Sequence, residues 1–213
     1  MDKTSEVNKE VEWWAGKGGD AYMDRCAIDP ATLLLRRKTW EDQFRIKDKG
    51  INVHRVLEIG PGPGLNLLAI HDLSPDWELV GVEPNETARK RLKTTCPFAT
   101  ILDGHAGDLS ALKSADFDFV FTAGVLIHIE PSKLKAAMSE IARVSRFHVF
   151  AVEYFAPKCE PIEYHGEVRL WRNNFGKLYR DLDLKEPWLN GHGFWSDLDG
   201  FDNCVWWDLW KNR

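Results

Sequence analysis

After residue 50 the chain alternates between short apolar runs and helical segments, and this alternation restricts the fold more than any other feature. Five apolar runs are too short to be helices and read as buried strands: 54–59, 78–83, 99–102, 117–122 and 147–154. Helical candidates lie between them at 65–73, 85–95 and 131–145. Strands that alternate with helices are typical of a parallel sheet covered by helices on both faces. The sequence therefore predicts an α/β protein with a doubly wound sheet.

The C-terminal segment changes this pattern. Residues 182–189 and 205–210 read as two strands with no helix between them. An antiparallel hairpin at one end of the sheet is the simplest closure for such a pair. The sequence therefore predicts a mostly parallel sheet of seven strands that ends in an antiparallel hairpin.

Two helices are expected before the sheet. The first follows Thr4 or Ser5 as an N-cap, and we expect it to break at the glycines 16, 18 and 19. The second is expected to begin at Asp29, with Pro30 in its first turn. Both helices precede the alternating region, so we expect them to pack around it as lead-in helices or a lid.

Composition narrows the classes of function. The 213 residues are 44% hydrophobic and 29% charged, which predicts one soluble domain with residues 1–50 as lead-in helices, 51–154 as core and 155–213 as a closing segment. The 28 basic and 33 acidic residues give a net charge of −5, so nucleic acid and membrane partners are not expected. Four widely spaced cysteines and the lack of a signal-peptide pattern predict a cytoplasmic protein without a metal site. The oligomeric state stays open.

The first strand runs into a glycine-rich loop in the segment VLEIGPGPGLNLL. Gly60, Gly62 and Gly64 stand between strand and helix, where glycine lets the backbone turn sharply and approach a ligand. The third glycine of a dinucleotide-binding fingerprint would fall on Leu65, so a nicotinamide site is disfavoured. Glu58 just before the loop suits an ammonium group better than a pyrophosphate. The loop is therefore predicted to bind a ligand with an amino-acid part.

The next two strands also end in polar residues. Glu83 comes 23 residues after Gly60, where an acidic side chain can accept both hydroxyls of a ribose. Pro84 follows it and could lie on a purine face. The third strand ends near Gly104, His105 and Ala106, which offer backbone and imidazole groups at the depth of an adenine ring, although a plain surface loop explains them equally well.

Together these residues resemble the class I S-adenosylmethionine-dependent methyltransferases, and the resemblance covers residues 54–154. It implies a Rossmann-like methyltransferase fold, with S-adenosylmethionine as cofactor and S-adenosylhomocysteine as product. It also implies that Glu58 and the loop 60–64 hold the methionine half, Glu83 the ribose and residues 104–106 the adenine. Thr122 and Ala123, after the fourth strand, would pass close to the sulfonium.

Several short motifs resemble a narrower group, the methylases associated with pseudaminic acid biosynthesis. These motifs are WWAGKGGDAY from residue 13, GVLIHIEP from 124, VEYF from 152, IEYHG from 162 and the Trp-rich final strand. This likeness implies that the methyl acceptor is a small polar metabolite, such as a sugar or a surface-glycan precursor.

Three residues at the ends of the fourth and fifth strands are the catalytic candidates. His128 is the best candidate for a general base, because an unperturbed imidazole titrates near working pH. The alternative is that the histidine only fixes its apolar loop through a hydrogen bond. Glu153 and Tyr154 close the fifth strand at the same edge, where a carboxylate and a phenol can orient a polar acceptor.

Two further groups flank this site. Tyr164, His165 and Arg169 are candidates for substrate binding, since a guanidinium beside an imidazole and an aromatic ring suits an anionic or sugar-like molecule; the alternative is the surface of a helix. Trp14 and Tyr22 flank the glycine-broken segment, which is predicted to fold over the cofactor as a lid. They would meet the methionine carboxylate or shield the methyl group from water.

Two other functions stay open at this point. A methyltransferase-like domain can bind cofactor or a partner without turnover, because folds persist after their chemistry is lost. The intact glycine loop and Glu83 argue against a wholly inactive site. A protein or RNA methylase is the other alternative, but it needs a broad or basic groove that this composition does not indicate.

Overall fold

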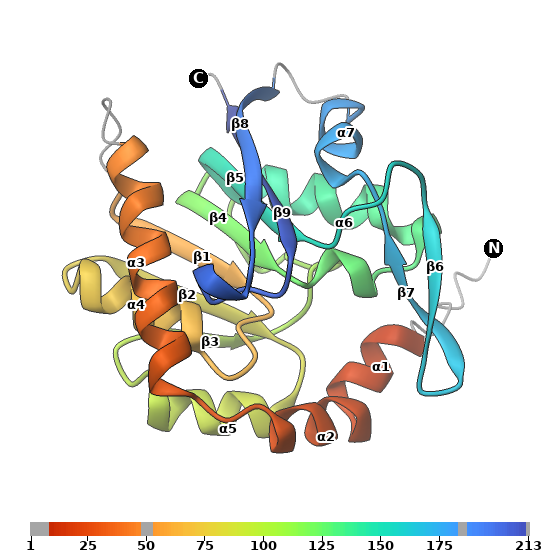
Figure 1. The fold of residues 1–213 in the computed structure, drawn as a ribbon, viewed down its shortest axis with the longest axis horizontal. Helices are drawn as coiled ribbons and strands as arrows, with labels where there is room; N and C mark the ends of the chain where they lie inside the picture. The colour runs from red at the N-terminus through yellow and green to blue at the C-terminus, as the bar shows by residue number, and fades with distance from the viewer. Residues whose placement is uncertain (1–8, 48–52, 183–186, 212–213) are drawn as a thin grey trace.

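A seven-stranded sheet forms the centre of the protein, as the computed structural model shows for residues 9–47, 53–182 and 187–211 (Figure 1). Its strand order is β3-β2-β1-β4-β5-β9-β8. The five central strands are β1 (Arg55–Ile59), β2 (Glu78–Glu83), β3 (Thr100–Asp103), β4 (Phe117–Ala123) and β5 (Ser145–Glu153), and all of them run parallel. β9 (Cys204–Lys211) is antiparallel to β5 and to β8 (Pro187–Trp195). The predicted doubly wound sheet with a C-terminal antiparallel hairpin is confirmed.

Helices cover both faces of the sheet. One face packs against α3 (Pro30–Lys47), α4 (Leu65–Leu73) and α5 (Glu86–Thr95), and the other packs against α6 (Pro131–Val144) and α7 (Phe175–Arg180). The short helices α1 (Lys9–Ala15) and α2 (Lys17–Arg25) lie at the bottom of Figure 1, away from both faces. They lie against the edge of the sheet where the parallel strands end, so they are placed to cover a site there.

Trp40 of α3 is the centre of the core on its face of the sheet. Its side chain is fully buried and makes an edge contact with Phe121 at a centroid distance of 5.0 Å. It also donates a hydrogen bond from Nε1 to Asn66 Oδ1 at 3.2 Å, which satisfies the indole N–H. Burying an aromatic ring of this size contributes about 2–3 kcal/mol of stability. Trp40 therefore fixes α3 against both the sheet and the start of α4.

The glycines near the N-terminus act differently from the prediction. The first helix does end at Ala15, but Gly18 and Gly19 lie inside α2 and do not break it. A Cβ at Gly18 would lie 2.3 Å from the ring of Trp13, and one at Gly19 would lie 1.9 Å from the carbonyl oxygen of Trp14. These glycines let α2 fold back tightly onto α1. The predicted caps Thr4 and Ser5 fall outside the described residues.

The C-terminal elements also differ from the prediction. The strand expected at 182–189 is displaced: Leu182 is a buried core residue just after α7, β8 covers Pro187–Trp195, and residues 183–186 lie outside the described residues. A second, two-stranded antiparallel sheet was not predicted and consists of β6 (Glu160–Tyr164) and β7 (Glu167–Arg172). This hairpin stands at the right of Figure 1, beside α1.

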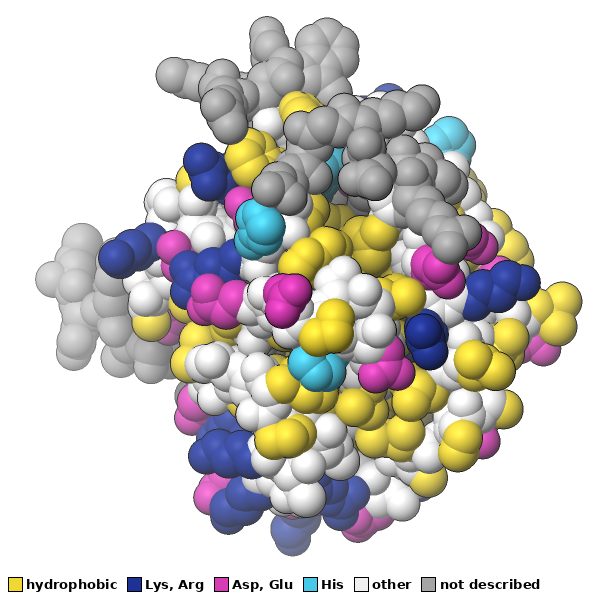
Figure 2. Space-filling view, turned by 90° about the vertical axis from the view of Figure 1, so that its left-hand side faces the viewer, with side chains coloured by type: hydrophobic (Ala, Val, Ile, Leu, Met, Phe, Trp, Pro, Cys, Tyr) yellow, Lys and Arg dark blue, Asp and Glu magenta, His cyan; other side chains and the backbone are white. Residues whose placement is uncertain are grey.

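The α3 side of the molecule carries scattered apolar groups. Figure 2 views this side and shows hydrophobic side chains among charged ones across its centre and right half. Leu34 of α3 and Leu198 of the short helix η2 (Asp197–Asp199) are the most exposed large hydrophobic residues described, with 65% and 79% of their surface accessible. Isolated exposed leucines are ordinary on soluble proteins, so this side marks no site.

Candidate active site

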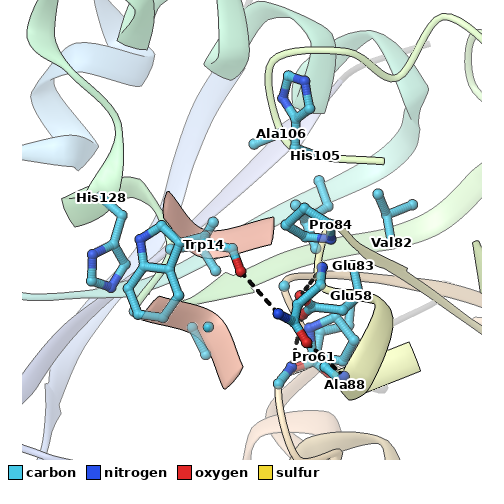
Figure 3. Close-up of a pocket in the computed structure, with 18 of the residues that line it drawn as sticks. Trp14, Glu58, Pro61, Val82, Glu83, Pro84, Ala88, His105, Ala106 and His128 are labelled. Carbon is cyan, nitrogen blue, oxygen red and sulfur yellow. Dashed lines mark hydrogen bonds between the residues drawn. The ribbon is translucent and has the colours of Figure 1, made fainter. Parts of the chain in front are cut away.

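A cavity of about 390 Å³ lies where β1, β2 and β4 end, with α1 and α2 over it. Its size falls within the range of small-molecule sites. Figure 3 shows Trp14 and His128 side by side at one end, Glu58 and Glu83 at the other, and His105 beyond them. The cavity therefore occupies the edge of the sheet at which ligands bind in open α/β folds.

The loop after β1 brings bare backbone to the cavity wall. Gly60 and Gly64 have φ angles of +70° and +93°, which residues with a side chain rarely adopt. A Cβ at Gly60 would lie 2.6 Å from the Val125 side chain, and one at Gly64 would lie 2.8 Å from the sulfur of Cys96. Gly60 and Gly62 line the cavity, whereas Gly64 packs against the end of α5. The glycines thus allow the tight turn and its close packing against Val125 and Cys96, and Gly60 and Gly62 bring backbone to the cavity wall.

Glu58 points from β1 into the cavity and keeps one carboxylate oxygen free. Its side chain is buried, with Oε1 accepting a hydrogen bond from Asn66 Nδ2 at 2.7 Å. Among the described residues, Oε2 has no hydrogen-bond partner. Burial raises the pKa of this carboxyl group to about 7. A buried, unpaired oxygen beside a cavity is costly in an empty site, and a ligand cation or N–H donor would satisfy it.

Glu83 ends β2 and is held by the backbone. Its Oε1 accepts from the N–H of Asn85 at 2.9 Å, and its Oε2 accepts from the N–H of Gly62 at 3.3 Å. Burial raises the pKa of the carboxyl group, and these hydrogen bonds partly oppose that shift. Each carboxylate oxygen can accept a second hydrogen bond, so both remain available to a diol. Pro84 lines the cavity next to it.

The loop after β3 contributes part of what the sequence predicted. His105 and Ala106 line the cavity together with Gly107, but Gly104 does not. The imidazole of His105 turns back to its own loop, where Nδ1 accepts from the N–H of Gly107 at 3.1 Å. At this end the loop backbone and the Ala106 side chain therefore form the wall.

His128 ends the short helix η1 (Leu126–His128), directly after β4. Its ring lines the cavity and meets the indole of Trp14 edge-on at 4.4 Å between centroids. Its Nδ1 is buried and has no hydrogen-bond partner among the described residues. Burial lowers the pKa of this imidazole to about 3, so the ring is neutral near pH 7 and, contrary to the expectation from the sequence, does not titrate near working pH. The alternative was that His128 only fixes its loop through a hydrogen bond, but the described residues make no such bond with its ring.

The two residues predicted at the end of β4 differ in their position. Ala123 lines the cavity, whereas Thr122 is buried in the strand.

Glu153 lies beneath the η1 loop and does not line the cavity. Its Oε1 accepts from the N–H groups of Val125 and Leu126, both at 3.1 Å, and its Oε2 accepts from Ile127 N–H at 3.4 Å. Burial raises the pKa of its carboxyl group to about 7. The structure thus gives Glu153 contacts that hold the turn leading to His128, in place of the predicted contact with an acceptor.

Tyr154 is also outside the lining of the cavity. Its hydroxyl donates to Asp202 Oδ2 at 2.7 Å, on the loop that precedes β9. Burial, followed by this hydrogen bond, raises the pKa of the phenol. The structure therefore places Tyr154 as a tie between β5 and the C-terminal loop, not beside a reacting group.

The predicted substrate residues Tyr164, His165 and Arg169 gather around Trp13 of α1. The two rings lie 5.8 Å from the Trp13 ring, and the Arg169 guanidinium carbon lies 5.1 Å from it. Arg169 also pairs with Glu10 at 3.5 Å. They are carried by the β6–β7 hairpin and not by a helix, and none of the three lines the cavity, although Glu10 does. The hairpin thus fastens α1 over the cavity.

The roof of the cavity is formed by Trp14 and Tyr22, whose rings meet edge-on at 5.4 Å. Asn85, at the start of α5, connects this roof to the sheet. Its Nδ2 lies within 3.3 Å of the carbonyl oxygens of Trp14, Ala15 and Gly16, and its Oδ1 accepts from Ala88 N–H at 2.7 Å. One side chain thus caps both the end of α1 and the start of α5, as the dashed lines in Figure 3 show in part.

Sequence reasoning missed several polar residues of the cavity, among them Arg36 and Asn66. Arg36 stands three residues after Leu33 and four before Trp40, so it shares the face that α3 turns to the core. A charged residue on a core-facing stripe is the signal that would have identified it. Asn66 sits in the first turn of α4, where an ordinary polar helix start hides its role.

Other kinds of site find no support in the described residues. No group of three or more histidine, cysteine, aspartate or glutamate side chains there is placed to hold a metal ion. Within the same ranges, no helix is long and apolar enough to cross a membrane.

A segment of the chain that contributes to this cavity matches a known protein family. Residues 56–147 match the family model described as a methyltransferase domain, whereas a search of curated proteins found no match. The match covers under half of the chain and describes that segment as a methyltransferase domain. The matched segment contains Gly60, Gly62, Glu83 and His128, which all line the cavity.

Three solved structures share the fold at low identity. Magnesium protoporphyrin IX methyltransferase from Synechocystis PCC 6803, solved with bound SAM, has a TM-score of 0.68 and 14% identity over 100% of both chains. The 1,6-didemethyltoxoflavin-N1-methyltransferase of Burkholderia thailandensis has a TM-score of 0.65 and 13% identity, covering 97% of this chain and 88% of its own. A SAM-dependent methyltransferase from Aquifex aeolicus has a TM-score of 0.59 and 16% identity, covering 85% and 93%. They show that the methyltransferase fold extends beyond the matched segment.

The residues of this cavity fit S-adenosylmethionine, the cofactor that the sequence resemblance implies. The unpaired Glu58 Oε2 can accept from an ammonium group, and the two Glu83 oxygens can accept from ribose hydroxyls. A Cβ at Gly60 would meet Val125, so this glycine lets the loop pack against the segment after β4. The donors and acceptors that the cavity presents are therefore those that an amino-acid nucleoside needs.

Proposed function

We propose that this protein is an S-adenosylmethionine-dependent methyltransferase and that it acts on a small polar metabolite whose nucleophilic oxygen or nitrogen lies beside His128. The observation that carries the proposal is the covered end of the cavity, where Trp14 of the roof meets His128 of the η1 loop at 4.4 Å. Arg169 and Glu10 fasten α1, so this helix covers part of the cavity. A covered cavity of this size suits a metabolite better than a folded protein or an RNA duplex.

When bound, S-adenosylmethionine supplies an electrophilic methyl group on a positively charged sulfur. Glu58 and Glu83 hold its amino-acid and ribose ends, so the methyl group has a fixed position relative to the η1 loop. Trp14 and Tyr22 exclude water from that position. His128, neutral near pH 7, accepts a hydrogen bond from the acceptor hydroxyl or amine and receives its proton. Glu153 keeps the histidine in place by holding the N–H groups of its turn.

Within this class, a sugar or surface-glycan precursor is the acceptor that we favour. The acceptor end combines the indole of Trp14 with the charged side chains of Glu10 and Lys133, which also line the cavity. An aromatic face beside hydrogen-bonding charged groups suits a molecule with apolar ring faces and many hydroxyls. The net negative charge of the chain and the cover of α1 over the cavity support the absence of a nucleic-acid partner.

The acceptor class is tested by incubating the purified chain with S-adenosylmethionine and three separate pools: sugar precursors including nonulosonates, total RNA, and unfolded protein. S-Adenosylhomocysteine is measured by mass spectrometry against a reaction without acceptor. We expect product above that background with the sugar pool alone. Turnover with RNA or protein alone would contradict the proposal. Cofactor binding without turnover in any pool would favour a non-catalytic binding domain instead.

Replacing Asn85 by alanine is expected to loosen the roof of the cavity. The loss of an N-cap should lower the free energy of unfolding by about 1 kcal/mol. Affinity for S-adenosylhomocysteine should also fall several-fold, because Asn85 holds the end of α1 through three carbonyl groups. Urea unfolding and calorimetry measure the two effects.

The matched control for this variant is Asn174→Ala. Asn174 caps α7 by accepting from Lys177 N–H at 3.0 Å and does not line the cavity. It should lose similar stability with unchanged ligand affinity. Equal affinity changes in the two variants would show that Asn85 acts only as a cap.

A further inference from the structure

A second hollow lies between α7 and the β8–β9 hairpin, which stand at the top of Figure 1, whereas α1 and α2 lie at its bottom. Its volume is about 450 Å³. We call it the α7 groove, and its lining includes Phe155, Lys177, Arg180, Leu189, His192 and Trp207. None of the described residues that line it also lines the first cavity. The function proposed above therefore gives the α7 groove no role.

The floor of the α7 groove is apolar and largely aromatic. The ring of Trp207 lies 6.3 Å from that of Phe155, measured between centroids. Phe155 and Leu189 leave 44% and 36% of their surface exposed, more than most large hydrophobic side chains of this protein. In α7, a Cβ at Gly176 would lie 2.2 Å from the Trp207 ring, so this glycine lets the helix approach the indole directly. The groove therefore offers an apolar surface that a flat ring can cover.

The charged part of the lining is basic. The chain has 33 acidic and 28 basic residues, yet none of the described residues that line the α7 groove is acidic. Lys177 and Arg180 of α7 and His192 of β8 face it. Lys177 pairs with Asp181, whereas Arg180 makes no hydrogen bond or ion pair with any described residue. A guanidinium whose donors are all unused is suited to a carboxylate, so the charge of this lining is complementary to an anion.

We propose that the α7 groove is a second ligand site, which binds a small aromatic carboxylate with its ring against Phe155 and Trp207 and its carboxylate on Arg180. A neutral ring would cover the floor but leave the guanidinium unpaired. A small inorganic anion would pair with the guanidinium but leave the apolar floor exposed. Only a ligand with both a flat apolar body and a negative charge uses both parts of the groove. This site does not depend on methyl transfer at the first cavity.

Heteronuclear NMR titration of the isotope-labelled full chain tests this proposal with 2-naphthoate and its neutral isostere 2-naphthamide. S-Adenosylhomocysteine is present throughout, so that the probes do not enter the first cavity. The indole N–H signal of Trp207 should shift saturably with naphthoate, while that of Trp14, in the roof of the first cavity, should stay in place. Wild-type protein should bind naphthoate about fivefold more tightly than naphthamide, as expected for one exposed ion pair.

Two variants separate the charged contact from the apolar one. Arg180→Gln should bind naphthoate and naphthamide equally, because only the carboxylate uses the guanidinium. Phe155→Ala should weaken both probes by a similar factor, about 2- to 10-fold for an aromatic contact. Arg146→Gln and Phe194→Ala are the matched controls, since both side chains are exposed and neither lines the α7 groove. Both controls should leave the two affinities unchanged.

Three results would overturn the proposal. One is the absence of a saturable shift of the Trp207 signal with naphthoate. Another is a wild-type protein that binds both probes equally, or a preference for naphthoate that Arg180→Gln retains. The third is an equal loss in Arg180→Gln and Arg146→Gln, which would show only a general attraction to surface charges. Arg180 is exposed and bonds to no described residue, so Arg180→Gln should fold even if Phe155→Ala does not.

Discussion

Replacing His128 by alanine is expected to lower turnover about 100-fold or more while leaving affinity for S-adenosylhomocysteine nearly unchanged. A positioned base contributes about that factor to transfer of a proton, and no hydrogen bond of the ring holds the protein together in the described residues. Steady-state rates and calorimetry on the two proteins measure these effects. His71→Ala is the control, since His71 stacks on Phe98 at 3.7 Å and is not part of the cavity lining.

The pH dependence of the same variant gives a second readout. Because burial lowers the pKa of His128 to about 3, the imidazole stays neutral as pH drops from 7 to about 5. Burial raises the pKa of Glu58 and of Glu153 to about 7, so a fall in the rate over this range should come from these carboxyl groups and should persist in His128→Ala. Stability behaves differently. Below about pH 6.5 the imidazole takes up a proton in the unfolded protein but stays neutral in the folded protein. The free energy of unfolding therefore has its full value above that pH and decreases as pH falls toward 3. His128→Ala should remove this part of the acid sensitivity.

Two outcomes would contradict the role of His128. Near-normal turnover of His128→Ala would show that the acceptor needs no base, as for an amine that arrives deprotonated. A rate that falls only in step with a lower melting temperature would show that the residue is structural.

Replacing Glu83 by alanine is expected to weaken S-adenosylhomocysteine binding by about 1.5–3 kcal/mol, because hydrogen bonds to a charged group are lost. Part of the loss comes from the N–H groups of Gly62 and Asn85, which lose their acceptor and hold the loop less firmly. Glu83→Gln keeps acceptor capacity and should show a smaller loss. Glu86→Ala is the control, because Glu86 pairs with Lys90 on the surface and does not line the cavity. Unchanged affinity in Glu83→Ala would place the ribose elsewhere.

The central part of the fold was predictable because each signal there is local. The predicted bounds of α4 and β2 agree with the structure. Turn residues mark the ends of both segments, and length separates the longer helix from the shorter buried strand. Asn85 was also identified as a cap from its residue type and position, and it accepts from Ala88 N–H as caps do. What the sequence does not show is that the same side chain also caps α1.

The C-terminal hairpin was predicted in kind but misplaced. β8 contains Gly191 and Gly193, so it lacks the apolar run that marks a strand. A Cβ at Gly193 would lie 2.7 Å from the ring of Trp206, which explains the glycine through a neighbour on another strand. Such cross-strand packing does not appear in a local pattern.

Some cavity residues were likewise predictable from local signals, and others were not. Glu58 and Glu83 were identified because strand ends and a glycine loop mark their positions in the chain. Glu153 was predicted to meet the acceptor but holds the N–H groups of a tight turn, a need that arises only once β4 and β5 lie side by side. Arg36 was missed because its place at the cavity wall depends on hydrogen bonds to Asn66 and Gly200, which lie 30 and 164 positions away.

Calorimetric titration of the full chain with S-adenosylhomocysteine and with NAD tests the central claim most directly. The glycine loop with its unpaired Glu58 oxygen should give a one-to-one complex with S-adenosylhomocysteine, and Glu83→Ala should weaken it. NAD should give no saturable heat, because Leu65 replaces the third glycine of a dinucleotide loop and the acidic Glu58 directly precedes that loop. Comparable affinity for NAD, or no binding of S-adenosylhomocysteine, would contradict the account.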